Sequence, residues 1–227
     1  MKTPRTRGAR APGPAPGTHE MVVVHRALRR EARLLVELVA AVAPGDTARA
    51  RVLADHFRGY RLGLHRHHRG EDEVLWPLLL ARVDLEADLV LRMEAQHERV
   101  AATLAAAGRA LPAWEGTAGE AERDTLVAVL AEHRAVLLAH VDEEERALLP
   151  LAARHVTAYE WAALGEHFMT STPQSELPLL LGMVLEDADR SERAALLAVL
   201  PRGVRLRWHV VGRPVHLHRT RTVRRSR

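Results

Sequence analysis

Two stretches of the chain decide the fold: HHRGEDEVLWP at residues 67–77 and HVDEEERALLP at residues 140–150. They align without a gap, and in each a histidine is followed four residues later by a glutamate and six residues after that by a proline. Residues four apart lie on one face of a helix, about 6 Å from each other. The pattern therefore predicts two matching helices that each present a His–Glu pair.

A second pair of histidines extends the repeat toward the N-terminus. His25 precedes His67 by 42 residues, and His97 precedes His140 by 43 residues. The chain thus contains the pattern H…HxxxE twice. In an antiparallel bundle this spacing gathers one histidine from each of four helices, together with the two glutamates of the repeat.

Apolar residues recur at alternating steps of three and four in segments of about 19–43, 46–83, 84–112 and 117–155. This is the period of helices packed in a bundle. Asp46 and Asp84 are predicted to cap the second and third segments, and residues 117–120 and 157–160 have the capping-box pattern. We expect an all-α chain with an up-down-up-down antiparallel four-helix bundle, an internal two-fold repeat and short C-terminal helices.

The depth of the histidines in this bundle is uneven. His25 and His67 lie at similar distances from the first turn, about 18 and 20 residues from it. If the third helix ends at Leu111 and Pro112, His97 and His140 differ in depth by six to nine residues. The loop around Trp114 must then absorb the difference, or the fourth helix begins elsewhere.

Composition and charge limit the function further. The chain has no cysteine, which excludes disulfides, thiolate metal sites and cysteine nucleophiles. Residues 1–18 and 202–227 are basic and contain no acid, whereas the body between them has a net charge of −9. An acidic body argues against specific nucleic-acid binding. The basic ends predict at most weak contact with anionic surfaces.

The domain boundaries follow from these shifts in composition. We expect a disordered basic arm at 1–18, the bundle at 19–155, a helical extension at 156–215 and a solvated basic tail at 216–227. Val204 and Trp208, with the arginines around them, predict a basic amphipathic helix that either docks on the bundle or lies on an anionic membrane. No transmembrane stretch or export signal is found, which predicts a cytoplasmic protein.

Histidines and glutamates interrupt the apolar stripes at positions that should face the core. Buried carboxylates need a counter-charge that neutral imidazoles do not supply, whereas a pair of cations does. A polar core network without metal is the alternative. Imidazole and carboxylate suit Fe, Mn or Zn, and six side chains from four helices favour two ions, most simply iron. The candidate ligands are His25, His67, Glu71, His97, His140 and Glu144.

Other polar residues receive weaker predictions. Tyr60 and His133 lie two turns before a ligand histidine and are expected to line a channel or to support the ligands. Glu94, one turn from His97, is a candidate replacement ligand. His68 is expected to point off the ligand face into solvent. Asp72, Glu73, Asp142 and Glu143 are expected to form a solvated acidic surface.

With His25 and His97 on the preceding helices, residues 67–77 and 140–150 resemble the hemerythrin family and its HHE cation-binding domain over about residues 19–155. The C-terminal part more loosely resembles the extension of actinobacterial hemerythrin-like proteins. The resemblance implies an oxo- or hydroxo-bridged di-iron centre that binds O2, NO or peroxide. His25 and His67 would hold one iron, His97 and His140 the other, and the two glutamates would bridge.

Two departures from the oxygen-carrying members of that family bear on the function. Those members have a second histidine where this chain has Ala101, and HxxxxD where it has HxxxE, although Glu145 offers the longer spacing. Fewer imidazoles favour ligand turnover over reversible O2 carriage. Three functions stay open: a di-iron protein that binds or consumes peroxide, NO or O2, with catalase-like activity undecided; a non-enzymatic iron or oxygen sensor that signals through the extension; and a bundle stapled by a passive metal.

Overall fold

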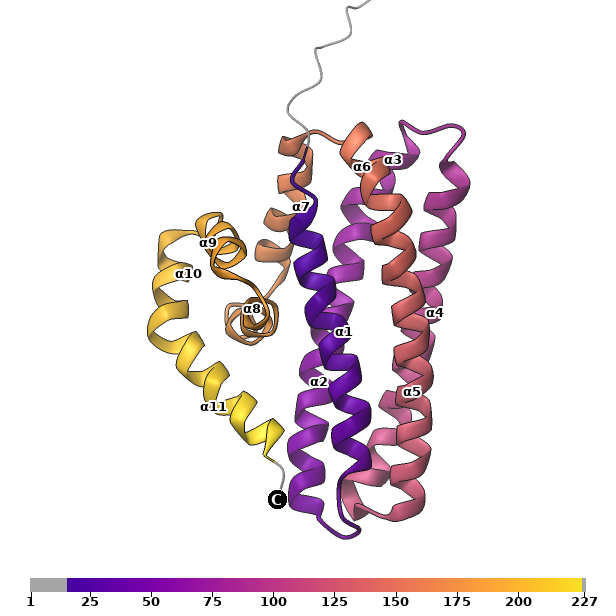
Figure 1. Ribbon diagram of the computed structural model, residues 1–227, viewed down its shortest axis with the longest axis vertical. Helices are drawn as coiled ribbons and strands as arrows, with labels where there is room; N and C mark the ends of the chain where they lie inside the picture. Colours follow the sequence, from indigo (N-terminus) through magenta and orange to yellow (C-terminus); the bar gives the residue numbers. More distant parts are fainter. Residues whose placement is uncertain (1–15, 226–227) are drawn as a thin grey trace, which may run out of the picture.

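A computed structural model of the chain describes residues 16–225, and these residues form helices and no strand. The all-α prediction is therefore confirmed. The expected disordered arm at 1–18 lies almost wholly outside the described residues. Four long helices stand side by side (Figure 1), with α1 and α4 each packed against both α2 and α5. Their bounds are α1 His19–Ala40, α2 Thr47–Gly70, α4 Ala87–Thr117 and α5 Glu120–Glu143.

The bundle is held by the apolar stripes of the sequence. Phe57, Trp114, Leu126 and Leu137 are among the fully buried side chains of a core shared by the four long helices. Burying a large apolar side chain contributes about 1.5–3 kcal/mol. At one end of the bundle the Gly45 N–H donates a 3.0 Å hydrogen bond to the Ala118 carbonyl, which ties the α1–α2 turn to the α4–α5 turn.

Two of the predicted helix starts are wrong. Asp46 does cap α2 by accepting a hydrogen bond from the Arg49 N–H, as expected. The N-cap of α4, however, is Glu86 rather than Asp84, and it makes no side-chain capping bond. The N-cap of α5 is Gly119, because the Thr117 hydroxyl accepts from the Gly119 N–H and Thr117 itself ends α4.

The third long helix also runs further than its sequence suggests. Pro112 lies inside α4, which continues to Thr117 and ends at Ala118 in the left-handed conformation with φ of 46°. Trp114 is fully buried in the last turns, and its packing outweighs the bond that a proline removes. His97 consequently lies 20 residues before the end of α4, and His140 lies 20 residues after the start of α5. The depth mismatch expected from the sequence disappears.

Each half of the repeat contains a π-helical turn that begins at its glutamate: η1 at Glu71–Leu75 and η2 at Glu144–Leu148. They lead into α3, Trp76–Leu80, and α6, Leu149–His155. In both, a proline stands six residues after the glutamate, lacks an N–H and crowds the carbonyl four residues back. The ladder responds by lengthening: Trp76 donates to the Glu71 carbonyl, and Leu149 donates to the Glu144 carbonyl.

The rest of the chain forms short helices on one side of the bundle (Figure 1), as expected. The Thr157–Glu160 capping box at the start of α7 is confirmed. The solvated tail expected at 216–227 is wrong where the structure describes it, because those residues continue α11 and Val223 is buried. The helices are α7 Ala158–Ser171, α8 Leu177–Glu186, α9 Arg190–Ala198, α10 Arg202–Arg207, the π-helical turn η3 Trp208–Gly212, and α11 Arg213–Arg224.

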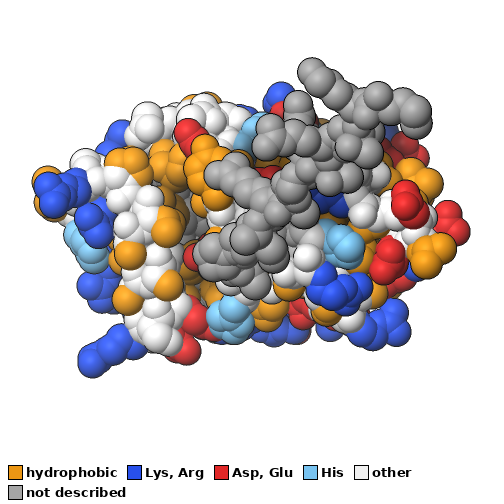
Figure 2. Space-filling model, turned by 90° about the horizontal axis from the view of Figure 1, so that it is seen from above, with side chains coloured by type: hydrophobic (Ala, Val, Ile, Leu, Met, Phe, Trp, Pro, Cys, Tyr) orange, Lys and Arg blue, Asp and Glu red, His pale blue; other side chains and the backbone are white. Residues whose placement is uncertain are grey.

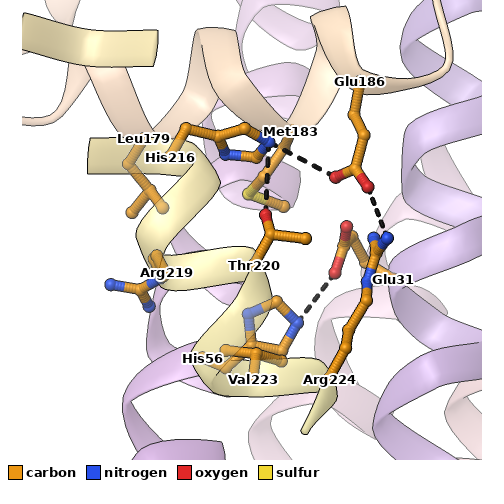
Figure 3. A pocket seen from close by; sticks show the side chains of 10 residues that line it. All are labelled: Glu31, His56, Leu179, Met183, Glu186, His216, Arg219, Thr220, Val223 and Arg224. Atoms are coloured by element: carbon orange, nitrogen blue, oxygen red, sulfur yellow. Dashed lines mark hydrogen bonds and ion pairs between the residues drawn. The ribbon is translucent and has the colours of Figure 1, made fainter. Parts of the chain in front are cut away.

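Ion pairs lie on both sides of the joint between this extension and the bundle, and the pair of Arg30 in α1 with Asp187, directly after α8, crosses it at 2.6 Å. Figure 3 shows Glu31 of α1 facing His56 of α2, with 2.7 Å between the carboxylate and Nε2. Beside them Glu186, at the end of α8, pairs with His216 and Arg224 of α11. Burial alone would raise the pKa of Glu31, but His56 and Arg30 outweigh it and hold that pKa at about 2. Glu31 is therefore a charged group inside the joint between bundle and extension.

Candidate metal centre

Seven side chains of the four long helices and their π-helical turns converge inside the bundle, and we call them the ligand cluster. They form two groups, in each of which one ligand atom per residue lies within 4.8 Å of the others. All but His67 are buried by the whole-residue measure, and the His67 side chain is only 8% exposed. One group consists of His25, His67, Glu71 and Glu144, and the other consists of His68, His97 and His140.

The two glutamates of the first group also contact histidines of the second. Glu71 has one carboxylate oxygen 3.6 Å from His67 Nε2 and the other 3.4 Å from His97 Nε2. Glu144 has one oxygen 3.3 Å from His25 Nε2 and 3.6 Å from His140 Nε2. Each carboxylate thus contacts an imidazole of both groups. A carboxylate in this position has the geometry to bridge two ions.

The cluster fits cations better than it fits a self-contained polar network. Its members leave seven buried atoms without a hydrogen-bond partner among the described residues: all four carboxylate oxygens and the Nε2 atoms of three histidines. Buried polar atoms rarely stay unpaired. The Nε2 atoms of His25 and His67 face each other at 3.2 Å, and two nitrogens each about 2.1 Å from one ion are separated by about 3.0–3.4 Å.

Charge inside the cluster is unbalanced. Burial raises the pKa of Glu71 well above its usual value, and the neighbouring Glu144 carboxylate raises it further. Burial would also raise the pKa of Glu144, but His25 and the other imidazoles hold it at about 2. Burial would lower the pKa of His25, yet Glu144 and Glu145 bring it to about 9. The two adjacent buried carboxylates therefore have too little positive charge near them to be ionised together. Bound cations would supply the missing positive charge.

Three of the histidines are oriented by hydrogen bonds to their other ring nitrogen. His25 Nδ1 lies 2.9 Å from Glu145, His97 Nδ1 lies 2.7 Å from Asp72, and His140 Nδ1 lies 3.1 Å from the Gln96 side-chain oxygen. Such contacts fix the ring and leave Nε2 free for a metal. Asp72 is exposed, as expected of a solvated acidic surface, and it also contacts a histidine of the cluster.

The acidic surface around these contacts is also partnered. Glu143 accepts from the amide of Gln96 and from Arg92, so it fixes the amide that contacts His140. Arg29 donates to Glu145 and to Asp142 at 2.6 Å each. Glu145 thus supports His25 and is neutralised by Arg29. Of the four residues expected on a solvated acidic surface, Asp72 and Glu143 thus support histidines of the cluster, whereas Asp142 pairs with Arg29 and Glu73 pairs with Arg69.

His68 is the main functional residue that the sequence interpretation missed. It was expected in solvent, but it is buried, and its ring stacks on His97 with 3.9 Å between ring centroids. Adjacent helix residues point about 100° apart, and a core-facing stripe is at least that wide. The doublet of His67 and His68 could have indicated two inward imidazoles. His68 gives the second group a third imidazole. This matters because α4 has Ala101 at the position where a second histidine is missing.

The supporting residues predicted from the sequence have different surroundings. Tyr60 donates a 2.8 Å hydrogen bond to His133 Nε2 in the core. Thr103 donates to the Val100 carbonyl, so its oxygen accepts from His133 Nδ1. Burial lowers the pKa of His133 to about 4, which keeps it neutral in this chain of hydrogen bonds. Glu94, by contrast, is exposed and belongs to neither group, which contradicts its proposed role as a replacement ligand.

Comparison with known protein families agrees with this geometry. The model of the Hemerythrin HHE cation binding domain matches residues 17–152. That range contains every member of the ligand cluster and ends before α7. Comparisons with curated proteins and with solved structures give no match.

Proposed function

Because this chain belongs to the hemerythrin HHE cation-binding family, we propose that it is a non-haem di-iron protein that binds or reacts with O2, NO or peroxide. In this proposal His25 and His67 would hold one iron, His68, His97 and His140 would hold the other, and Glu71 and Glu144 would be shared between them. The same proposal takes the four long helices as an up-down-up-down bundle, which is supported by the packing of α1 and α4 against both α2 and α5.

The proposal rests on the carboxylate oxygens of Glu71 and Glu144, which are buried and have no hydrogen-bond partner among the described residues. Each of the two carboxylates contacts one imidazole of the first group and one of the second. The donors are all nitrogen and oxygen, which suits iron and manganese, and zinc in closed four-ligand sites. The first group provides two imidazoles and the second three, besides the shared carboxylates. With the carboxylates shared, the first group therefore has fewer protein donors to offer an ion than the second, which leaves it more room for a small ligand.

When bound, an iron pair supplies redox chemistry and open coordination positions for a small ligand. The protein supplies the rest. Leu64, Val100 and Leu137 belong to the buried core, and each lies one helical turn from a histidine of the cluster, where these apolar side chains exclude water and large ligands. Glu145, Asp72 and Gln96 hold the imidazoles in position. Burial raises the pKa of Tyr60, so this phenol keeps its proton and its bond to His133.

Absorption spectroscopy of the aerobically purified protein tests the proposal. A diferric centre gives near-ultraviolet charge-transfer bands that change on adding azide, NO or peroxide, and the variant His67→Ala with His140→Ala lacks both the bands and the iron. Stoichiometric iron in that double variant would contradict the ligand assignment. A colourless protein with stoichiometric zinc would support a passive structural metal instead.

Oxygen release from added peroxide separates an enzyme from a sensor. A catalytic centre turns over peroxide faster than the same concentration of free iron does, and the rate falls to that level in the double variant. Peroxide or NO that changes the spectrum without turnover indicates sensing. The joint between the bundle and the extension is where such a change would reach the C-terminal helices.

A further inference from the structure

The helical arm made of α10, η3 and α11 has two apolar faces, and we call its solvent-facing side the outer face. Trp208 and Gly212 are buried against the rest of the extension, and Val223 is buried in the core of the bundle. Residues two positions from Trp208 point to the opposite side of a helix. There Leu206 and Val210 are each 65% exposed.

The outer face continues along α11. Val211, Val215 and Leu217 are exposed large apolar residues, and Pro214 beside them is exposed as well. Of the ten exposed large apolar residues in the described chain, six lie between Val199 and Leu217. A helix that is apolar on both sides normally has both sides covered. The inner side is covered by the protein, and no described residue covers the outer face.

Positive charge surrounds this apolar strip. Residues 202–227 contain nine arginines and no acid. Arg202, Arg207, Arg213 and Arg221 are exposed, and no ion pair within residues 16–225 holds them. In Figure 2, basic and histidine side chains stand beside apolar ones at the left end of the molecule, the side on which α10 and α11 lie in Figure 1.

We infer that the outer face of this arm binds the surface of an anionic lipid bilayer. Aliphatic side chains flanked by arginines can enter the interface between headgroups and acyl chains while the guanidinium groups bind lipid phosphates. A second copy of the chain fits less well, because it would bring two strongly basic strips together. Nucleic acid would satisfy the arginines but would leave the aliphatic strip without a partner. Trp208 faces inward, so the arm stays docked on the extension while it binds.

Co-sedimentation of the full-length, iron-loaded protein with lipid vesicles tests this inference. We expect binding to phosphatidylcholine vesicles that contain about a quarter phosphatidylglycerol, weakened by salt, and no binding to pure phosphatidylcholine. The variant Leu206→Glu with Val210→Glu should lose about tenfold or more in partitioning, because both side chains leave the apolar layer. Both positions are exposed, so these substitutions leave the fold intact.

Matched controls separate the apolar strip from general effects of charge. Leu85→Glu with Leu91→Glu places the same charges on exposed apolar residues outside the arm and should reduce binding far less. Arg207→Gln with Arg213→Gln should weaken binding more than Arg99→Gln with Arg109→Gln, two exposed arginines of α4.

Three results would overturn the inference. One is equal binding of the Leu206/Val210 and Leu85/Leu91 variants to anionic vesicles. The second is tight binding to duplex DNA with none to vesicles. The third is a concentration-dependent dimer, lost in the Leu206/Val210 variant, without vesicle binding. None of these outcomes depends on the metal, so they leave the proposed di-iron function untouched.

Discussion

The substitution His68→Ala tests the part of the metal centre that the sequence repeat does not contain. His68 is buried and stacks on His97 within the second group of the ligand cluster. Its removal leaves that group with two imidazoles instead of three. We expect the variant to retain the first iron and to bind the second weakly, so that purified protein holds about one iron per chain rather than two.

The size of the effect follows from the number of donors lost. Losing a contact that only orients a ligand commonly weakens metal binding 10- to 100-fold, and loss of a direct ligand costs at least the upper end of that range. A 100-fold loss corresponds to about 2.7 kcal/mol. Because a metal that binds only the native state stabilises it, the iron-loaded variant should melt about 5–11 °C below the wild type, at about 2–4 °C per kcal/mol for a chain of this length.

Calorimetry with and without iron, paired with elemental analysis, measures both quantities. His65→Ala is the matched control, because His65 is an exposed histidine on the same helix. Comparing each variant with its own metal-free form removes any effect on packing. If the His68→Ala protein holds two irons per chain and gains as much melting temperature from iron as the wild type does, His68 is not a ligand.

Three further predictions concern groups outside the ligand cluster. The pKa of Glu31 is about 2 in the fold, against 4.5 for an ordinary glutamate, so the stabilisation from this carboxylate is present above pH 4.5 and is lost as the pH falls toward 2. Glu31→Gln should be less stable than the wild type at pH 7 by up to about 3 kcal/mol, and urea unfolding should show this difference disappearing below pH 3. Tyr60→Phe leaves the buried His133 Nε2 unpaired and should cost about 1–3 kcal/mol, whereas Tyr159→Phe, at an exposed tyrosine, should leave the melting temperature unchanged. Thr157→Ala removes a capping box and should cost about 1 kcal/mol in denaturant unfolding, and an unchanged midpoint would show that α7 does not need the cap.

Much of the helical framework could be predicted from the sequence, because periodicity and turn residues are local features. The end of α4 could not, since Pro112 normally stops a helix and only the tertiary burial of Trp114 carries α4 past it. The π-helical turns were not predicted either. The three turns begin at Glu71, Glu144 and Trp208, and each has a proline six residues after its first residue. Local clashes at these prolines, rather than the hydrophobic pattern, set those turns.

The candidate site was only partly predictable for a related reason. The repeat identified six residues that the structure brings together, because their spacing alone places them on inward faces. It did not identify His68, whose role depends on how α2 is rotated in the bundle. Nor could it identify Asp72 and Gln96, which reach His97 and His140 only after the helices pack.

The composition of the chain permits a direct count of its metal. Five methionines and no cysteine give five sulfur atoms per chain, an internal standard for X-ray emission from the purified protein. If the ligand cluster holds an iron pair, the spectrum will show two iron atoms for every five sulfur atoms, and this iron will be absent from the variant His67→Ala with His140→Ala. A protein purified from iron-replete cells that shows no stoichiometric metal, or the same iron content in that variant, would contradict the account.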